Sequence, residues 1–423
     1  MKHVGVGGDG TGWLRLRYQV AGAVGAVLFP YALMLAFSPA ALASADLLTT
    51  TCLYSLAATF LGIVLLRSVS HYPGVEASAY LVPSFAISYG FLLTVVILAR
   101  LPYSRTLLFS GFVLVLVWFL TMHAVVGRRR TLIIGVVPGG GHEMLPASRG
   151  IRWVELAHPG HEVADLHAVT ADLRVDLAPE WDRKLADFAL AGVPVYHTKH
   201  LAESLTGMVQ LEHLSENSFG TLSPVSAFMT VKHIVDWVTA AAAAVALSPL
   251  LLAVAVAIRL DSPGPAIFRQ SRIGYRGKPF TVFKFRTMVA LNPSAPALDA
   301  AKTVAGDKRI TRIGAFLRRS RIDELPQIFN ILKGEMSWIG PRPEARVLSE
   351  WYEGEIPFYR YRHIVRPGLT GWAQVSQGHV AEVEDVRNKL YFDFYYIKNY
   401  SLWIDLLILA RTIQTVLTGF GAK

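Results

Sequence analysis

Five long apolar segments constrain this chain more than any other feature of its 423 residues. The first four run over about 18–37, 46–66, 79–99 and 106–125, each roughly 20 residues, the length that crosses the hydrocarbon core of a bilayer. Hydrophobic residues make up 52% of the chain, more than an ordinary soluble enzyme contains. The pattern predicts a membrane protein whose first domain, residues 1–130, is a four-helix transmembrane bundle.

Basic residues flank both ends of this predicted bundle. Lys2, Arg15 and Arg17 precede the first segment, and three consecutive arginines, 128–130, follow the fourth. Because positive residues concentrate in cytoplasmic loops, an even number of spans between them predicts that both ends are cytoplasmic. Two arginines in the third connection run against this prediction.

Residues 131–225 change to a pattern of short strands and helices. "TLIIGVV" and "VPVYH" are typical of strands, whereas "EWDRKLADFALAG" and "KHLAESL" are typical of helices. Their alternation predicts a small Rossmann-like α/β module of a degenerate nucleotide-binding type. The glycines after the first strand begin a dinucleotide-binding pattern, but that pattern would need a glycine at Met144. An ordinary tight turn is the alternative.

The fifth apolar segment differs from the first four because Ser248 and Pro249 interrupt it. Proline removes a helix hydrogen bond and clashes one turn back, so the helix should kink or break there. Positive charge stands on both sides, with Lys232 before and Arg259 after, which favours both ends on one membrane face. We predict a re-entrant membrane helix over residues 226–260, broken at this pair. A proline-kinked spanning helix is the alternative.

Positive charge is concentrated after this segment. Residues 259–346 contain seventeen Lys/Arg and seven Asp/Glu, a surplus as large as the +10 of the whole chain. Nucleic acid, an anionic membrane surface or phosphorylated substrates could explain such a surplus. No nucleic-acid-binding motif occurs in the sequence, so the membrane surface and phosphorylated substrates are favoured.

Within this basic region, "RRSRIDELPQIFNILKG" places two adjacent carboxylates behind several arginines. Pro326 is tolerated only in the first turn of a helix, which predicts a helix start near Asp323 and an end at Gly334. Asp323 and Glu324 would then lie at a helix N-terminus, where backbone amides favour an anion. A plain helix N-cap is the alternative interpretation of the pair.

Several basic residues are predicted to surround this pair: Lys284, Arg286, Arg318, Arg319, Arg321 and Arg342. Arg342 stands between two prolines, which hold it at low entropic cost, as suits a bidentate phosphate contact. One carboxylate that attacks phosphorus while its neighbour holds a divalent cation needs this combination of charges. The pattern therefore favours phosphoryl-transfer chemistry.

Three stretches of the second half carry a further pattern: "SPGPAIFRQSRIGYRGKPFTVFKFRTM", "RIDELPQIFNILKGEMSWIGPRPE" and "VRPGLTGWAQV". In order and spacing they resemble the bacterial sugar transferase family, the polyprenyl-phosphate hexose-1-phosphate transferases with one re-entrant membrane helix. The resemblance extends from about Val231 to the C-terminus. The four leading spans and the α/β module resemble, more loosely, the large undecaprenyl-phosphate galactose or glucose phosphotransferases.

The resemblance implies that Asp323 is the nucleophile and Glu324 the ligand of Mg²⁺, with Mn²⁺ as the alternative metal. Asp393 is expected to support the site. Phosphate or nucleotide contacts are expected from five basic residues: Lys284, Arg286, Arg318, Arg321 and Arg342. The sequence departs from the family at Ser376–Val380, where "SQGHV" stands in place of a common Asn-Gly-Arg.

The fold class expected from these observations is a membrane α/β protein that ends in a mostly α catalytic domain. That domain covers residues 261–423 and includes a C-terminal amphipathic helix. The expected partners are undecaprenyl phosphate, the membrane and a UDP-sugar, with UDP-glucose or UDP-galactose first. A homodimer is compatible with the sequence, and nucleic acid is not expected.

The implied reaction moves hexose-1-phosphate to the lipid and releases UMP. It would occur at the cytoplasmic face of a bacterial inner membrane, as the first membrane step of exopolysaccharide, capsule or O-antigen (lipopolysaccharide) synthesis. A catalytically silent scaffold or nucleotide-sugar sensor is the alternative. A transporter is disfavoured because the first four spans contain almost no ionisable residue at mid-depth.

Overall fold

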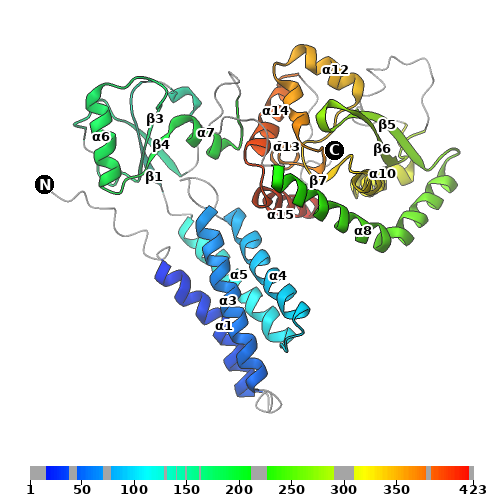
Figure 1. The fold of residues 1–423 in the computed structure, drawn as a ribbon, viewed down its shortest axis with the longest axis horizontal. Helices are drawn as coiled ribbons and strands as arrows, with labels where there is room; N and C mark the ends of the chain where they lie inside the picture. The colour runs from blue at the N-terminus through cyan, green and yellow to red at the C-terminus, as the bar shows by residue number, and fades with distance from the viewer. Residues whose placement is uncertain are drawn as a thin grey trace. The chain divides into compact units, whose positions relative to one another are not determined.

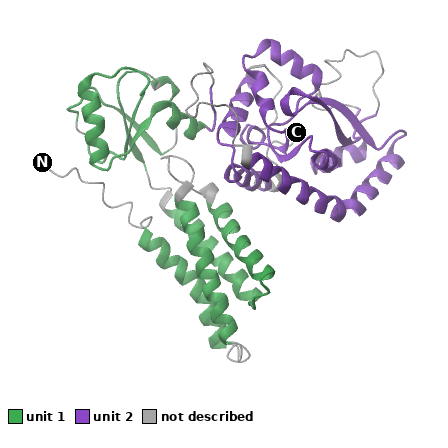
Figure 2. Cartoon of the chain, viewed as in Figure 1, with its two compact units in different colours: residues 1–206 green, residues 207–423 purple. Residues whose placement is uncertain are grey.

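A computed structural model describes the protein over residues 16–37, 45–69, 78–127, 131–139, 141–147, 150–161, 163–210, 226–289, 309–377 and 383–418. These residues form two compact units, 1–206 and 207–423 (Figure 2). The described elements are mostly helices, with one small parallel sheet in unit 1 (Figure 1). This composition agrees with the predicted membrane α/β class.

Unit 1 begins with four apolar helices, α1 (Leu16–Phe37), α3 (Ala45–Val69), α4 (Ser78–Leu98) and α5 (Arg105–Gly127). Each agrees with a predicted segment and is long and apolar enough to cross a membrane. The helices share a core that includes Phe85 and Phe119, whose ring centroids lie 4.8 Å apart. Of the basic residues that predicted the orientation, Lys2, Arg15 and those at 128–130 lie outside the described residues.

The second part of unit 1 is a four-stranded parallel sheet in the order β2-β1-β3-β4. Its strands are β1 (Leu132–Val136), β2 (Ile151–Glu155), β3 (Ala168–Ala171) and β4 (Val195–His197), and its helices are α6 (Pro179–Leu190) and α7 (Thr198–Thr206). The sequence patterns predicted β1, β4, α6 and α7. They missed β2 and β3, which are only five and four residues long.

The glycine-rich turn after β1 does not continue into a long helix. Gly139 and Gly141 have φ of 136° and 77°, conformations that glycine adopts without steric cost. The 3₁₀ turn η2 (His142–Met144) follows, and then β2. No α-helix occurs in the described part of this connection, whereas a dinucleotide-binding turn opens one. The observed geometry is that of the tight-turn alternative.

Unit 2 begins with α8 (Ser226–Asp261), a helix of 36 residues that contains Pro249 and changes direction along its length (Figure 1). Proline at this position leaves the carbonyl of Val245 without its usual amide donor, and the Ser248 hydroxyl donates to that oxygen at 2.8 Å. An internal proline costs about 3 kcal/mol, of which one hydrogen bond offsets about 1 kcal/mol. The predicted break is therefore a bend in a continuous helix, and the re-entrant path stays a prediction.

The rest of unit 2 combines two small β-structures with short helices. The antiparallel pair is β5 (Ile267–Ile273) and β6 (Pro279–Phe285), and the parallel pair is β7 (Ser337–Ile339) and β8 (Gly368–Thr370). The helices are α10 (Arg312–Arg319), α11 (Ile328–Leu332), α12 (Arg346–Glu355), α13 (Trp372–Ser376), α14 (Val383–Lys398) and α15 (Leu402–Thr418), and the 3₁₀ turns are η4 (Tyr275–Gly277), η5 (Ile322–Gln327) and η6 (Tyr359–Ile364).

Helix α8 shares two hydrophobic clusters with this body. The part before Pro249 contributes Ala240 and Leu247 to a cluster with Ile328 and Ile331 of α11. The part after Pro249 contributes Ile258 to another cluster that contains residues of β6 and α10. Alanine at the first contact lets the two helices approach closely. The predicted amphipathic helix is α15, which buries one apolar face and exposes Leu402, Leu409 and Ile413.

Candidate active site

Three segments that are far apart in sequence meet at Glu324. Lys284, on β6, donates from Nζ to Glu324 Oε1 at 3.0 Å. Arg342, which follows β7, donates from Nη2 to the same oxygen at 2.5 Å and from Nη1 to Oε2 at 3.3 Å. The side chains are largely buried, with 16%, 19% and 10% of their surfaces exposed for Lys284, Arg342 and Glu324. Glu324 is therefore the centre of a closely packed charge cluster.

The local backbone explains how Asp323 and Glu324 enter this cluster. Arg321, between α10 and η5, has φ of 59°, a left-handed conformation that costs roughly 1–2 kcal/mol outside glycine. It turns the chain so that Asp323 and Glu324 occupy the first turn of η5, and both are buried. The observed helix start is at Ile322, one residue before the prediction, and Gly334 ends the element with φ of 74°.

The N-cap alternative does not describe this geometry. The residue in the cap position before η5 is Arg321, and no side chain caps that turn. Asp323 and Glu324 follow it inside the turn rather than in front of it. Their burial beside cations therefore needs another explanation than helix capping.

The two neighbouring carboxylates differ in their electrostatics. Burial alone would favour the neutral acid in Glu324, but Arg342 and Lys284 hold its pKa well below the usual range. Asp323 behaves in the opposite way, because burial and the adjacent charge of Glu324 raise its pKa. Its Oδ1 atom is buried and has no hydrogen-bond partner. Glu324 is thus a fixed anion, whereas Asp323 retains an unused, poorly solvated oxygen.

Lys284 is the titratable cation of the cluster. Burial lowers its pKa to about 8, although Glu324 attracts the protonated form. Arg272, on β5, is also buried, and burial together with Arg342 lowers its pKa to about 10. Near neutral pH both groups remain charged, so three cations face the two carboxylates. Such a surplus is suited to a ligand with several negative charges.

Arg342 is held from behind by a second set of buried groups. Arg362 donates from Nη2 to the carbonyl oxygen of Arg342 at 2.8 Å and from Nη1 to the Tyr359 hydroxyl at 2.7 Å. Asp393, on α14, pairs with Arg362 at 2.8 Å, and both residues are almost fully buried. Asp393 therefore lies behind the charge cluster and orients Arg362. Its predicted role in the site stays a prediction.

Sequence reasoning did not assign roles to Arg272, Glu344, Lys389 or Arg362. Arg272 donates to the carbonyl of Pro343, and Lys389 pairs with Glu344, so the segment around Arg342 is fixed on both sides. Arg272 and Glu344 both lie within the family motifs quoted above. For Glu344, the arginine and proline directly before it were the sequence signal that could have indicated a role. Nothing local in the sequence indicates the pairing of Lys389 with a residue 45 positions away.

The other predicted phosphate-binding residues lie around the cluster in different ways. Arg318 is half-buried and donates from Nε to the Thr287 hydroxyl at 3.0 Å, whereas Arg321 is exposed. The guanidinium of Arg286 donates to the carbonyls of Pro263 and Ser262 at 2.8 and 2.6 Å, and its phosphate contact stays a prediction. The structure thus gives Arg286 the role of fixing the turn after α8. The physical reason is that several carbonyl groups gather where a helix ends.

Asp323 and Glu324 provide oxygen donors of the type that Mg²⁺ prefers. Magnesium is commonly held by one or two carboxylates together with substrate phosphates, and Glu324 is the carboxylate predicted to hold it. The three hydrogen bonds to Glu324 use three of its roughly four lone-pair positions. Among the described residues no group of three or more His, Cys, Asp or Glu side chains gathers around one point. The pair therefore fits a metal that is completed by a phosphorylated substrate.

The departure from the family pattern at Ser376–Val380 lies only partly within the described residues. Ser376 ends α13, and the side-chain Nε2 of Gln377 donates to the carbonyl of Asp385 at 3.3 Å. The remaining three positions of this loop are outside the described residues.

Comparison with known proteins identifies the chain's relatives. Residues 227–419 match the family described as bacterial sugar transferase. An Aeromonas hydrophila protein named UDP-N-acetylgalactosamine-undecaprenyl-phosphate N-acetylgalactosaminephosphotransferase is 46% identical over 363 residues, which cover 86% of this chain and 85% of that protein. Proteins named UDP-glucose:undecaprenyl-phosphate glucose-1-phosphate transferase match a shorter part. Those of Xanthomonas campestris and Caulobacter vibrioides are 44% and 46% identical over 45% of this chain, and over 39% and 71% of their own lengths.

Proposed function

The chain belongs to the bacterial sugar transferase family, and from this premise we propose that it transfers a sugar 1-phosphate from a UDP-sugar to undecaprenyl phosphate and releases UMP. The observation that carries the proposal is the contrast between the two adjacent carboxylates. Two cations hold Glu324 as an anion, whereas Asp323 keeps a buried oxygen without a hydrogen-bond partner. A double displacement at phosphorus needs both kinds of group.

The proposed reaction has two steps. A carboxylate oxygen of Asp323 attacks the β-phosphorus of the UDP-sugar, and the bond between that phosphorus and the bridging oxygen breaks, so that UMP leaves. A phosphate oxygen of undecaprenyl phosphate then attacks the same phosphorus and displaces Asp323. The products are a lipid-linked diphosphate sugar and the free carboxylate. Each step is a phosphoryl transfer, which depends mainly on positioning and charge neutralisation.

The cations of the cluster supply the charge neutralisation. Arg342 presents a planar guanidinium suited to bidentate phosphate contacts, and its hydrogen bonds with Glu324 hold it in place. Lys284 provides a second positive charge near neutral pH. Glu324, with Asp323 beside it, would hold Mg²⁺, which when bound neutralises charge on the donor's diphosphate. The fixed negative charge of Glu324 thus serves both the arginine and the metal.

For the sugar we propose N-acetylgalactosamine ahead of the glucose or galactose expected from sequence. The relative named for N-acetylgalactosamine phosphate transfer aligns with 86% of this chain, including its first half. The relatives named for glucose-1-phosphate transfer align with 45% of it. Turnover with UDP-N-acetylgalactosamine should therefore be compared with turnover with UDP-glucose and with UDP-galactose to identify the sugar.

We further propose that the reaction takes place at the cytoplasmic face of the inner membrane. The donor is a water-soluble nucleotide sugar and the acceptor phosphate lies at the bilayer surface, so the site must stand at that surface. Helix α8, apolar enough to enter a bilayer, shares hydrophobic clusters with α11 and with β6. A re-entrant path for α8 would hold the charge cluster at the depth of the lipid phosphate.

The test is UMP exchange in the absence of lipid. The purified protein, incubated with UDP-N-acetylgalactosamine and labelled UMP, should incorporate label into the nucleotide sugar, and its intact mass should rise by one sugar phosphate. Asp323→Asn should show neither signal but should still bind the donor. Glu350→Gln, a carboxylate change at an exposed ion pair, is the matched control and should behave as the parent. Lipid-dependent turnover without exchange would mean direct attack by the lipid phosphate, and no UMP release at all would favour a silent scaffold.

A further inference from the structure

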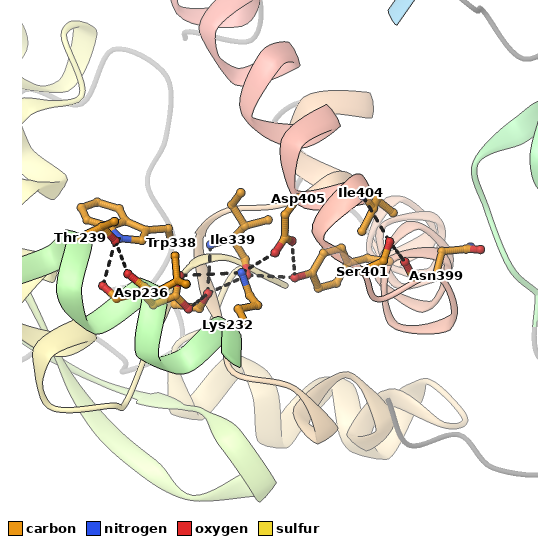
Figure 3. A network of polar contacts seen from close by, with 12 residues as sticks. Lys232, Asp236, Thr239, Trp338, Ile339, Asn399, Ser401, Ile404 and Asp405 are labelled. Carbon is orange, nitrogen blue, oxygen red and sulfur yellow. Dashed lines mark hydrogen bonds and ion pairs between the residues drawn. The ribbon is translucent and has the colours of Figure 1, made fainter. Parts of the chain in front are cut away.

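The first half of α8 carries a polar stripe whose two charged members are buried. Lys232, Asp236 and Thr239 recur at helical spacing, so they share one face of the helix. Lys232 Nζ lies 2.6 Å from Asp405 Oδ2 of α15 and 3.9 Å from Asp236 Oδ1 (Figure 3). The three charged residues are between 4% and 8% exposed. Charged groups are costly to bury, so their presence on an otherwise apolar membrane helix calls for a specific role.

Asp236 and Thr239 of this stripe contact two of the three residues of strand β7, and Tyr396 of α14 contacts the third. Ser337 Oγ lies 2.6 Å from Asp236 Oδ2, and Trp338 Nε1 donates to the Thr239 hydroxyl at 2.8 Å. The hydroxyl oxygen of Tyr396 lies 2.9 Å from Asp405 Oδ1 and 3.1 Å from the carbonyl oxygen of the third β7 residue, Ile339, so these two acceptors share its single proton. Helix α8, strand β7 and helix α15 are thus joined by one polar network.

Strand β7 leads directly to the arginine of the charge cluster. Only Gly340 and Pro341 separate it from Arg342. A Cβ atom on Gly340 would lie 2.4 Å from the carbonyl oxygen of Arg366, so the chain passes through a space that admits only glycine. The fixed φ of Pro341 removes further freedom. A displacement of β7 would therefore be passed on to Arg342.

Helix α8 also supports Glu324, the residue that Arg342 contacts in the charge cluster. Ala240 and Leu247 of α8 pack against Ile328 and Ile331 of α11, and α11 directly follows the turn that carries Glu324. Helix α8 is thus a common base, with polar contacts to the segment of Arg342 and apolar contacts to the segment of Glu324.

We propose that Lys232, Asp236 and Asp405 are positioning residues that set Arg342 against Glu324. Ion pairs that are buried contribute little net stability, but they fix the relative placement of the elements that carry them. The membrane helix would in this way determine the geometry of the charge cluster, in addition to contacting the bilayer. The inference rests on the proposed sugar-phosphate transfer, because catalysis is its readout.

The first test replaces Lys232 by methionine in the full chain and measures UMP exchange at saturating UDP-N-acetylgalactosamine. Misplaced catalytic groups slow a reaction by about 10- to 100-fold, and we expect a loss of that size with donor affinity changed less than about threefold. Lys232→Arg should restore most of the rate because it keeps the charge. Arg346→Met, which removes an exposed ion pair, should leave the rate unchanged.

The second test asks whether Lys232 acts through Arg342. In an Arg342→Lys background, which keeps a cation and measurable activity, Lys232→Met should lower exchange by less than about threefold, because residues of one network have non-additive effects. The same factor in both backgrounds would show that Lys232 supports general stability only and would overturn the proposal. A folded Lys232→Met protein with parental exchange would also overturn it.

If Lys232→Met does not yield folded protein, Ser337→Ala replaces it. This change removes one hydroxyl from the network, and the same non-additivity with Arg342→Lys is expected on a loss of a few fold. If the parent itself shows no UMP exchange, the covalent step of the proposed function fails. The same single and double variants are then compared by lipid-dependent UMP release. Non-additive effects of the two changes would still support the positioning role, and additive effects would overturn it.

Discussion

The four helices of unit 1 and helix α8 of unit 2 are all long and apolar enough to cross a membrane, yet they are built differently. In the unit 1 helices, 17–44% of the residues in each apolar window are buried, whereas only 6% of the α8 window is buried. Buried hydroxyls on α3, such as those of Ser55 and Thr59, donate to carbonyls of their own helix. Lys232 and Asp236 on α8 instead contact α15 and β7.

This difference separates two uses of a hydrophobic helix. The unit 1 helices satisfy their polar groups among themselves and share a core of their own. Helix α8 pairs its buried charged groups with α15 and with β7, the strand that leads to Arg342, so it belongs structurally to the catalytic unit. We therefore expect small changes in unit 2 to have large catalytic effects, and large changes in unit 1 to have small ones.

The largest effect is expected from Asp323→Asn. The amide keeps the shape of the side chain but is a very poor nucleophile, so lipid-dependent turnover should fall by roughly 10³- to 10⁵-fold, as when other covalent nucleophiles are removed. Turnover is measured as UMP released in the presence of undecaprenyl phosphate. Substantial turnover by a folded variant would reduce Asp323 to a metal ligand.

Glu324→Gln should have the next largest effect. It removes the anion that Arg342 and Lys284 contact, which leaves two buried cations uncompensated and weakens the proposed Mg²⁺ site. We expect a loss of roughly 10²- to 10³-fold, comparable to the loss of one group that stabilises transition-state charge. Part of the activity should return at high Mg²⁺ concentration. Equal recovery of Asp323→Asn under that condition would argue against distinct roles for the two carboxylates.

The pH dependence should depend on Lys284. Its pKa of about 8 means that it is charged below that pH and loses its proton above it. Parental turnover should therefore decline above pH 8. If the charge is essential, about one tenth of the turnover should remain one pH unit above that value. The turnover of Lys284→Arg should not decline above pH 8, because arginine stays protonated. The acid limb should be the same in both, since it follows Asp323, whose raised pKa makes it protonate earlier as pH falls.

Pro249→Leu should have a moderate effect, on the path of α8. Leucine restores the missing helix hydrogen bond and favours a straight helix. A C-terminal reporter should be cytoplasmic in the parent, and part of the variant population should be inverted or degraded, with a few-fold loss of total activity. Ser248→Ala is the matched control, because it leaves the proline but removes the hydroxyl that covers the Val245 carbonyl. A periplasmic reporter in the parent would contradict the re-entrant path.

The smallest effect should come from the largest change, removal of residues 1–206. A chain that starts at Gly207 keeps the bond from Trp372 Nε1 to the Gly207 carbonyl at 2.8 Å and that from the Val209 amide to Tyr391 at 3.0 Å. Its UMP exchange in detergent should stay within about threefold of the parent, since effects of distant parts are independent. A start at residue 226 should lower the free energy of unfolding by about 1 kcal/mol per lost hydrogen bond. A folded but inert 207–423 chain would place unit 1 in the active site.

Local rules were sufficient for the elements of both units that rest on periodicity or turn chemistry. Twenty-residue apolar windows predicted the helices of unit 1, and Pro326 with Gly334 placed the element that carries Asp323 to within one residue at its start. The family motifs identified the pair that the structure buries next to Lys284 and Arg342. These features are encoded within a few neighbouring residues.

Contacts between distant segments could not be derived in this way. Lys232 and Asp405 are 173 positions apart, and neither one's neighbours in sequence indicate the partner. Arg286 was assigned to phosphate by its place in a basic motif, and that motif does not indicate its hydrogen bonds to the backbone carbonyls of the turn after α8. Charge density thus predicted the kind of ligand correctly for the family, but the contacts of individual arginines depend on tertiary structure.

The separation of Lys232 and Asp405 along the sequence also has a consequence for the order of events during synthesis. Asp405 follows Lys232 by 173 positions, which a ribosome adds in roughly 9–35 s at about 5–20 residues per second. During that time the carboxylate of the network available to the lysine is that of Asp236, one helical turn away and 3.9 Å from its ammonium group in the finished protein. We expect a nascent chain that stops before α15 to be degraded faster than one that includes it, which pulse-chase labelling can measure. Helix α15 would then mark, for the cell's proteases, whether the membrane helix has found the partner of its buried lysine.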